Sequence, residues 1–306
     1  MTALRIQGLL FCAIAAGVAA AGVVVADALA LALGGTTGLL VLAALILLLG
    51  VPHGALDIVF AQELYGVHGL RHWCGFTLAY LSAGLLVVLI WHTMPQLFLL
   101  GFLLLSALHF SGDPAPGTSL VARLLYGGAM IVLPALLHEN EMARLFAFLV
   151  LPQAAMLLAS FLHEISWPWL LATALAAAWQ SRTHWLTGLE MAAAAALALL
   201  APPLLAFTVF FCAMHGARHI VRTWHYAGAG AESTTRLGRA ALLPMLGTLI
   251  LGGAAAYGLR AAPLEAGLMQ LVFVGLAALT VPHMALVEQV RWSGWARRDA
   301  PSPLNR

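Results

Sequence analysis

The run LLVLAALILLL at residues 39–49 contains no polar side chain. A membrane-spanning strand would alternate apolar residues that face lipid with polar residues that face a lumen, and this run shows no such alternation. A helix that crosses the bilayer needs about 20 predominantly apolar residues, and residues 36–60 around this run supply them. The run therefore predicts a transmembrane helix, whose later part carries the polar motif PHGALD at residues 52–57.

The composition extends this prediction to the rest of the chain. Of the 306 residues, 62% are hydrophobic and 8% are charged, and the mean hydropathy is +0.96. A soluble domain has about a quarter of its residues charged, so most of this surface must face lipid, where helices satisfy every backbone polar group. We therefore predict an all-α fold: a polytopic transmembrane helical bundle of about ten helices, forming a single integral-membrane domain over residues 1–306.

The apolar segments that suit membrane helices lie between residues 6 and 290. They are 6–31, 36–60, 73–92, 96–112, 118–138, 142–163, 184–200, 203–222, 238–259 and 264–290. The stretch 166–180 is also apolar, but it is short and contains Pro168, so we expect a re-entrant or interfacial piece rather than a further crossing. Residues 291–306 are expected to form a short cytoplasmic tail.

The arginines orient this layout in the membrane. All 14 basic residues are arginine, and in the predicted layout only Arg144 and Arg260 fall on the outer side. The positive-inside rule then places both termini in the cytoplasm and the chain in the cell inner (plasma) membrane. The first segment also begins like a signal peptide, but it is long for one, so we favour a retained helix. The net charge of +2 gives no indication of a nucleic-acid partner.

Histidines inside the apolar segments are the strongest functional signal. The chain has 12 histidines, and the ones inside predicted spans are His53, His109, His215, His219 and His283. An ionisable side chain within a bilayer is costly unless it is paired, so it indicates function. One such histidine could be a hydrogen bond between helices, but in the predicted layout all of these lie near the C-terminal ends of even-numbered spans. They would therefore share the cytoplasmic half of the membrane, which indicates a common site.

The spacing of two histidines suits metal binding. His215 and His219 stand four residues apart, on one face of a helix, and Gly216 leaves that face open to a neighbouring helix. With His53 and His109 from two other spans, they form a predicted four-imidazole site. Imidazole ligands favour iron, copper, zinc or nickel over magnesium or calcium.

Three further polar residues are candidates for supporting such a site. Asp57 and Asp113 each follow a candidate ligand by four residues, and a carboxylate hydrogen-bonded to a ligand would balance charge and fix its tautomer. Asp113 could equally be a helix-end residue before Pro114. His283 could be a fifth ligand, a donor behind the ligands or a packing residue. Its motif VPHMAL at residues 281–286 matches VPHGAL at 51–56 at every position except the fourth.

Together, PHGALD at 52–57, HFSGD at 109–113, HGARH at 215–219 and PHM at 282–284 resemble the Brp/Blh family of bacterial and archaeal β-carotene 15,15′-dioxygenases. The resemblance implies a membrane-embedded non-haem iron oxygenase that cleaves the central double bond of β-carotene with O2 into two retinal molecules. It also implies Fe(2+) held by His53, His109, His215 and His219, and a family histidine of unassigned role at His283. The retinal would serve a rhodopsin.

A substrate of this kind would need an apolar tunnel. Candidate lining residues are Phe110, Tyr126, Phe207, Phe210 and Phe211, although packing in the core or against lipid is the more common role of such residues. Other functions stay open on the residues alone: another membrane-embedded histidine-metal oxidase or hydroxylase acting on a lipid, a bis-histidine haem protein, or a membrane transporter that carries its substrate past polar residues.

Overall fold

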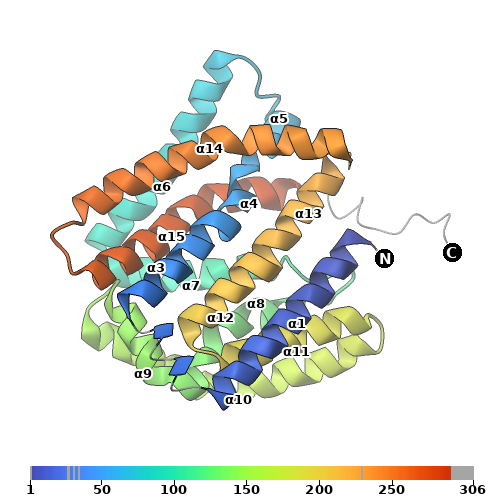
Figure 1. Cartoon of the computed structure of the whole chain (residues 1–306), viewed down its shortest axis with the longest axis vertical. Helices are drawn as coiled ribbons and strands as arrows, with labels where there is room; N and C mark the ends of the chain where they lie inside the picture. Colours follow the sequence, from blue (N-terminus) through green and yellow to red (C-terminus); the bar gives the residue numbers. More distant parts are fainter. Residues whose placement is uncertain (1, 26–27, 30–31, 34, 229, 291–306) are drawn as a thin grey trace.

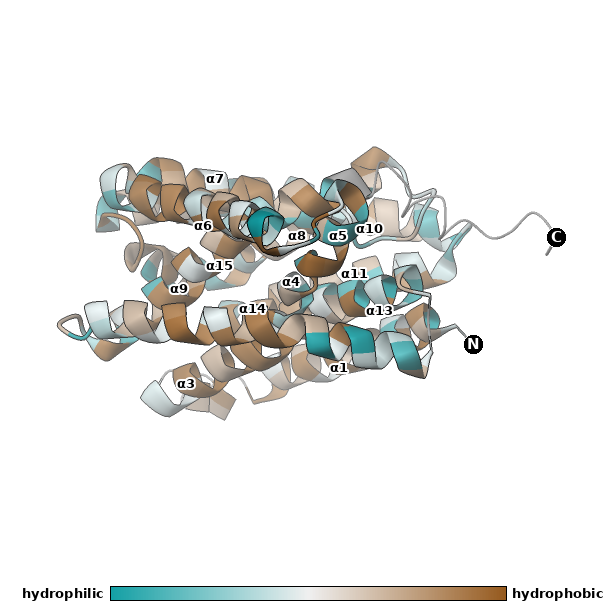
Figure 2. Ribbon diagram, turned by 90° about the horizontal axis from the view of Figure 1, so that it is seen from above, coloured by the Kyte–Doolittle hydropathy of each residue, from teal (hydrophilic) through white to brown (hydrophobic). Residues whose placement is uncertain are grey.

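The structure is a computed structural model that describes residues 2–25, 28–29, 32–33, 35–228 and 230–290. Within these ranges the chain is helical and contains no strand, which confirms the all-α prediction (Figure 1). Apolar residues run along most of these helices (Figure 2), as expected of a membrane protein. The predicted tail at residues 291–306 lies outside the described residues.

The helices follow one another in chain order with short connections. They are α1 (Ala3–Val24), α3 (Thr36–Leu45), α4 (Pro52–Ala55), α5 (Asp57–Tyr65), α6 (Leu70–Thr93), α7 (Pro95–Phe110), α8 (Leu120–Val132), α9 (Pro134–Ala147), α10 (Pro152–Ser181), α11 (Trp185–Leu200), α12 (Pro203–Val209), α13 (Ala217–Tyr226), α14 (Ala231–Gly258) and α15 (Leu264–Val290). Two segments have the wider π-helical winding, η1 (Ile46–Gly50) and η2 (Phe210–Gly216).

The expected number of about ten membrane helices is not confirmed. Among the described residues, seven helices are long and apolar enough to cross a membrane, or up to eight if the bent pair α8 and α9 is one span. Two further apolar helices, α7 and α11, have only 16 residues each. The side of the membrane on which each terminus lies stays a prediction.

Several predicted segments are wrong in their boundaries. The predicted span 118–138 crosses the break between α8, which ends at Val132, and α9, which begins at Pro134. The predicted span 142–163 contains a helix break, because α9 ends at Ala147 and α10 begins at Pro152. The stretch 166–180, expected to be a separate short piece, belongs to the 30-residue helix α10, which continues through Pro168. The physical reason is the position of proline: at the first turn of a helix its missing N–H removes no hydrogen bond, so Pro152 starts a helix readily, whereas neighbouring helices can accommodate a proline inside a membrane helix.

The two π-helical segments pack against each other. Glycine makes this approach possible on both sides. A Cβ atom at Gly50 would collide with the ring of Phe211, and one at Gly216 would lie 3.4 Å from both Gly50 O and His53 Nδ1. Short π-helical segments occur frequently at functional sites, and here they bring the helical stretch that carries His53 against the one that carries His215.

Helix α1 is packed against other helices, whereas α6 and α14 lie at the outside of the bundle. Helix α1 packs against α11, η2 and α13 (Figure 1), with Phe11 and Ala15 fully buried. Helices α6 and α14 lie at the periphery, and their most apolar stretches are unburied within the protein. Both contact α15, and α14 also contacts α4 and α5.

Candidate metal centre

The structure brings the intramembrane histidines together. All of them are buried: His53, His109, His215, His219 and His283. Ring centroids lie 4.4 Å apart for His109 and His215, 4.9 Å for His53 and His215, and 5.0 Å for both His53 and His283 and His219 and His283. The ligand nitrogens of His53, His109 and His215 all lie within 4.8 Å of one another. Side chains from four separate helical stretches therefore share one centre.

Hydrogen bonds at Nδ1 orient three of these rings. His283 Nδ1 lies 2.6 Å from Asp57 Oδ1, and His215 Nδ1 lies 3.1 Å from both carboxylate oxygens of Asp113. His53 Nδ1 lies against the carbonyl oxygen of Gly50. An Nδ1–H that donates to an oxygen leaves the Nε2 lone pair free, which is the tautomer that a metal ligand requires.

The hydrogen bonding of the Nε2 atoms indicates whether these residues fit a metal. Those of His109, His215 and His283 are buried and have no hydrogen-bond partner in the described part of the chain. Leaving a buried polar atom unsatisfied costs about 1–3 kcal/mol, so three such atoms at one centre need a common explanation. A divalent cation accepts imidazole nitrogen as a ligand, and Asp57 and Asp113 would balance its charge. The residues therefore fit a metal ion.

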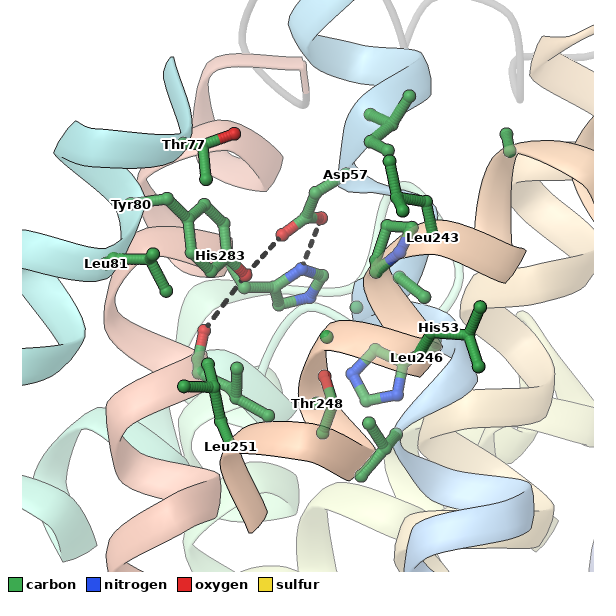
Figure 3. Close-up of a pocket in the computed structure, with 18 of the residues that line it drawn as sticks. His53, Asp57, Thr77, Tyr80, Leu81, Leu243, Leu246, Thr248, Leu251 and His283 are labelled. Carbon is green, nitrogen blue, oxygen red and sulfur yellow. Dashed lines mark hydrogen bonds and ion pairs between the residues drawn. The ribbon is translucent and has the colours of Figure 1, made fainter. Parts of the chain in front are cut away.

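Each carboxylate supports a histidine from another helix rather than the one four residues before it. Asp57, in the PHGALD motif, accepts the hydrogen bond of His283, and Asp113, in HFSGD, accepts that of His215. Asp57 also accepts a hydrogen bond from Tyr80 Oη at 2.8 Å (Figure 3). Tyr80 was missed in the sequence, where its only signal is a hydroxyl within an apolar helix.

Two arginines that follow His215 donate hydrogen bonds to the backbone around Asp113. Arg218 Nη1 donates to Asp113 O at 3.1 Å, and Arg222 donates to the carbonyls of Gly112 and Asp113 at 3.0 Å. Arg218 is buried and forms a two-pronged ion pair with Glu190, with N–O distances of 2.5 and 2.9 Å. Buried charges inside an apolar sequence could have indicated these residues, but their partners lie on other helices.

A cavity of about 760 Å³ opens beside the histidines. Asp57, Tyr80 and His283 lie together at its wall, with His53 nearby (Figure 3). The remaining lining is largely apolar and comes mainly from α6, α14 and α15. Leu243 of α14 lines the cavity although its side chain is 75% exposed, so the cavity extends to the outer surface. Its volume lies within the range of about 300–1,000 Å³ that small-molecule sites have.

The aromatic residues predicted to line a tunnel fall in different places. Phe211 lines the large cavity. Phe207 lines a second cavity of about 70 Å³, and its ring stacks on that of Phe211 at 5.4 Å. Phe110, Tyr126 and Phe210 pack against one another in the core and line neither cavity. Of this set, the structure places only Phe211 between the histidines and the large cavity.

Comparisons with known proteins show the family of the chain. A sequence model of the family described as beta-carotene 15,15′-dioxygenase matches residues 44–291. A relative named beta-carotene 15,15′-dioxygenase, from the uncultured marine bacterium 66A03, is 31% identical over 251 residues, which cover 80% of this chain and 91% of the relative. No solved structure matches the chain. Because the family match spans most of the chain and includes every histidine of the centre, the chain belongs to the β-carotene 15,15′-dioxygenase family of oxidoreductases.

Proposed function

We propose that the protein cleaves the 15,15′ double bond of β-carotene with O2 and releases two all-trans-retinal molecules. We further propose that Fe(2+) is the metal, with His53, His109, His215 and His219 as its ligands and with Asp57 and Asp113 supporting them. His283 lies at the same centre, as a fifth ligand or as a further supporting residue. One observation carries the proposal: buried imidazoles, among them those of His109 and His215 with unpartnered Nε2 atoms, meet beside an apolar cavity that His53 and His283 line. Membership of the family supports the choice of substrate.

A ferrous ion held by imidazoles would supply the activation of O2 at the substrate's double bond. The protein's own part is to hold and orient. The hydrogen bonds of Asp113 to His215 and of Asp57 to His283 fix ring orientation, and the apolar lining of the cavity excludes water from the reacting centre. A polyene held along this lining would present a double bond beside His53 and His283.

The outer position of the cavity suits a substrate that is dissolved in lipid. Helices α6 and α14 form two of its walls, and both lie at the periphery of the bundle. Ile250 of α14, which lines the cavity, is 71% exposed. We therefore propose that the carotenoid reaches the centre sideways from the bilayer, between α6 and α14. The cell inner membrane is the proposed location, and a retinal-binding rhodopsin is the proposed user of the product.

Expression in cells that make β-carotene tests the proposal. The wild-type chain is expected to bleach the orange colour and to accumulate retinal, identified by chromatography. His215→Ala and His219→Ala are expected to abolish both effects. His225→Ala is the matched control, because this exposed histidine of α13 donates from Nδ1 to Val221 O and packs against the ring of Trp224, away from the centre. Retinal formation by either ligand variant would overturn the ligand assignment.

The same expression experiment separates the alternatives. A hydroxylase would convert the carotenoid without shortening it, and a transporter would leave it unchanged. The iron content of the purified protein adds a second criterion, because one iron per chain is expected. About two irons per chain would indicate the di-iron class of membrane hydroxylase instead, and a haem absorption band would indicate an electron carrier.

A further inference from the structure

Helix α1 contributes a buried amide to the segment that carries His215. Gln7 is 7% exposed, and its Nε2 donates to Ala213 O at 2.8 Å and to Met214 O at 3.4 Å. These are the two residues that precede His215 in the π-helical segment η2. A residue on the first helix thus contacts the backbone that sets the position of a candidate ligand more than 200 positions further along the chain.

The other end of the same amide joins the network around Asp113. Gln7 Oε1 accepts a hydrogen bond from Arg218 Nε at 2.9 Å. Arg218 also binds Glu190 and donates to Asp113 O, and the Asp113 carboxylate receives His215 Nδ1. Gln7 therefore connects the two groups that fix His215, its own backbone and its carboxylate partner.

The neighbouring residue shows that α1 is fitted closely to this network. A Cβ atom at Gly8 would collide with Glu190 Oε1 and would lie 3.1 Å from Arg218 Nη2. Because lipid offers no hydrogen-bonding partners, a donor lost from a buried network of a membrane protein is not replaced by solvent.

We propose that Gln7 is a positioning residue for His215, acting through the backbone of η2 and through Arg218. The proposal rests on the proposed role of His215 as a metal ligand. It assigns α1, which lies before the residues matched by the family model, to the metal centre. Gln7 touches neither the histidine rings nor the large cavity, so its effect on the reaction is indirect.

Two variants separate the two ends of the amide. Gln7→Met keeps the length of the side chain and removes the donors and the acceptor. Gln7→Glu keeps an oxygen that can accept from Arg218 but loses the donors to Ala213 and Met214. Gln180→Met is the matched control, because Gln180 is a buried glutamine of α10 that contacts none of these groups. All are compared as monodisperse, detergent-purified protein loaded with Fe(2+).

The readout is the rate at which a colorimetric chelator removes iron, together with the visible spectrum of the Co(II)-loaded protein. We expect iron release about 10–100-fold faster in Gln7→Met and in Gln7→Glu, the range seen for residues that orient metal ligands, with a changed Co(II) spectrum. Gln180→Met should behave like the wild type. A wild-type release rate and spectrum in Gln7→Met would overturn the inference, and wild-type behaviour of Gln7→Glu alone would overturn the route through η2.

The outcome also distinguishes this inference from the proposed function. If the wild type binds iron and forms retinal while both Gln7 variants release iron at the wild-type rate, only the inference fails. If the wild type binds no metal, the proposed function fails and the inference fails with it. If one of the two Gln7 variants does not fold, the other still tests the proposal, because both remove the hydrogen bonds that Gln7 donates to η2.

Discussion

The carboxylate of Asp57 binds His283, which lies 226 residues further along the chain, at 2.6 Å. His53, four residues before Asp57 in the same motif, lies instead against the carbonyl of Gly50. The second pair, Asp113 and His215, spans 102 residues in the same way. These two pairs tie together four helical stretches, so the carboxylates stabilise the arrangement of the bundle as well as the orientation of the rings.

Replacing Asp57 should weaken metal binding. Asp57→Asn keeps the shape of the side chain but removes its charge and one of the two oxygens that receive His283 and Tyr80. We expect affinity for iron to fall about 10–100-fold, measured as iron per chain after dialysis. Glu63→Gln is the control, because Glu63 is an exposed acid of the same helix α5. Equal iron retention in both variants would contradict the role given to Asp57.

Filling the large cavity should block the substrate without disturbing the metal. Gly247 of α14 lines the cavity, and a Cβ atom there would meet nothing within 4 Å. Gly247→Leu therefore places a side chain in the space proposed for the polyene, and kcat/KM for β-carotene should fall at least about tenfold. Gly252→Leu is the control, because this glycine of the same helix also has open space around it but does not line the cavity. Equal activity of the two variants would exclude this cavity as the substrate site.

Adding one methyl group between the π-helical segments should disturb the centre. In Gly216→Ala the new Cβ would lie 3.0 Å from Phe211 O and 3.4 Å from Gly50 O and His53 Nδ1. We expect a loss of about 1–3 kcal/mol of stability from overpacking, seen as a lower Tm, and faster release of iron. Gly238→Ala on α14, where nothing lies within 4 Å, should leave both unchanged. If the Tm of Gly216→Ala is equal to or higher than that of the wild type, the close contact between η1 and η2 at Gly216 is not needed for stability.

Removing the metal should affect both activity and stability. Treatment with a chelator is expected to stop retinal formation and to lower the Tm, and Fe(2+) should restore both. A ligand present at 100 times its Kd stabilises the folded state by about 2.7 kcal/mol, which is ample for a thermal shift. His215→Ala should show no shift on adding Fe(2+). Retinal formation that survives exhaustive chelation would refute a catalytic metal.

Much of the centre could be predicted from the sequence, because a polar side chain in an apolar segment is rare enough to be informative. His53, His109, His215, His219 and His283 were chosen on that ground, and the structure brings them together. Gly216 was expected to admit a neighbouring helix, and the backbone of η1 lies there. These predictions needed only local composition and spacing.

Features that depend on contacts between helices could not be read in the same way. Nothing near Asp57 in the sequence indicates His283 or Tyr80 as its partners, and nothing near Gln7 indicates η2. The break before Pro152 was misplaced because apolar residues continue on both sides of it, so hydropathy shows no boundary. Phe110 and Phe211 look alike in sequence and both pack in the core, and only the structure shows that Phe211 also lines the cavity.

The spread of the histidines along the chain has a consequence for biosynthesis. His53 lies on the stretch that begins at α3, and His283 lies on α15, the last helix that the structure describes. During translation the early imidazoles enter the membrane long before their final neighbour is made, and contacts of such large sequence separation form late. Iron loading is therefore expected to follow completion of the chain, so the newly inserted protein passes through a metal-free stage.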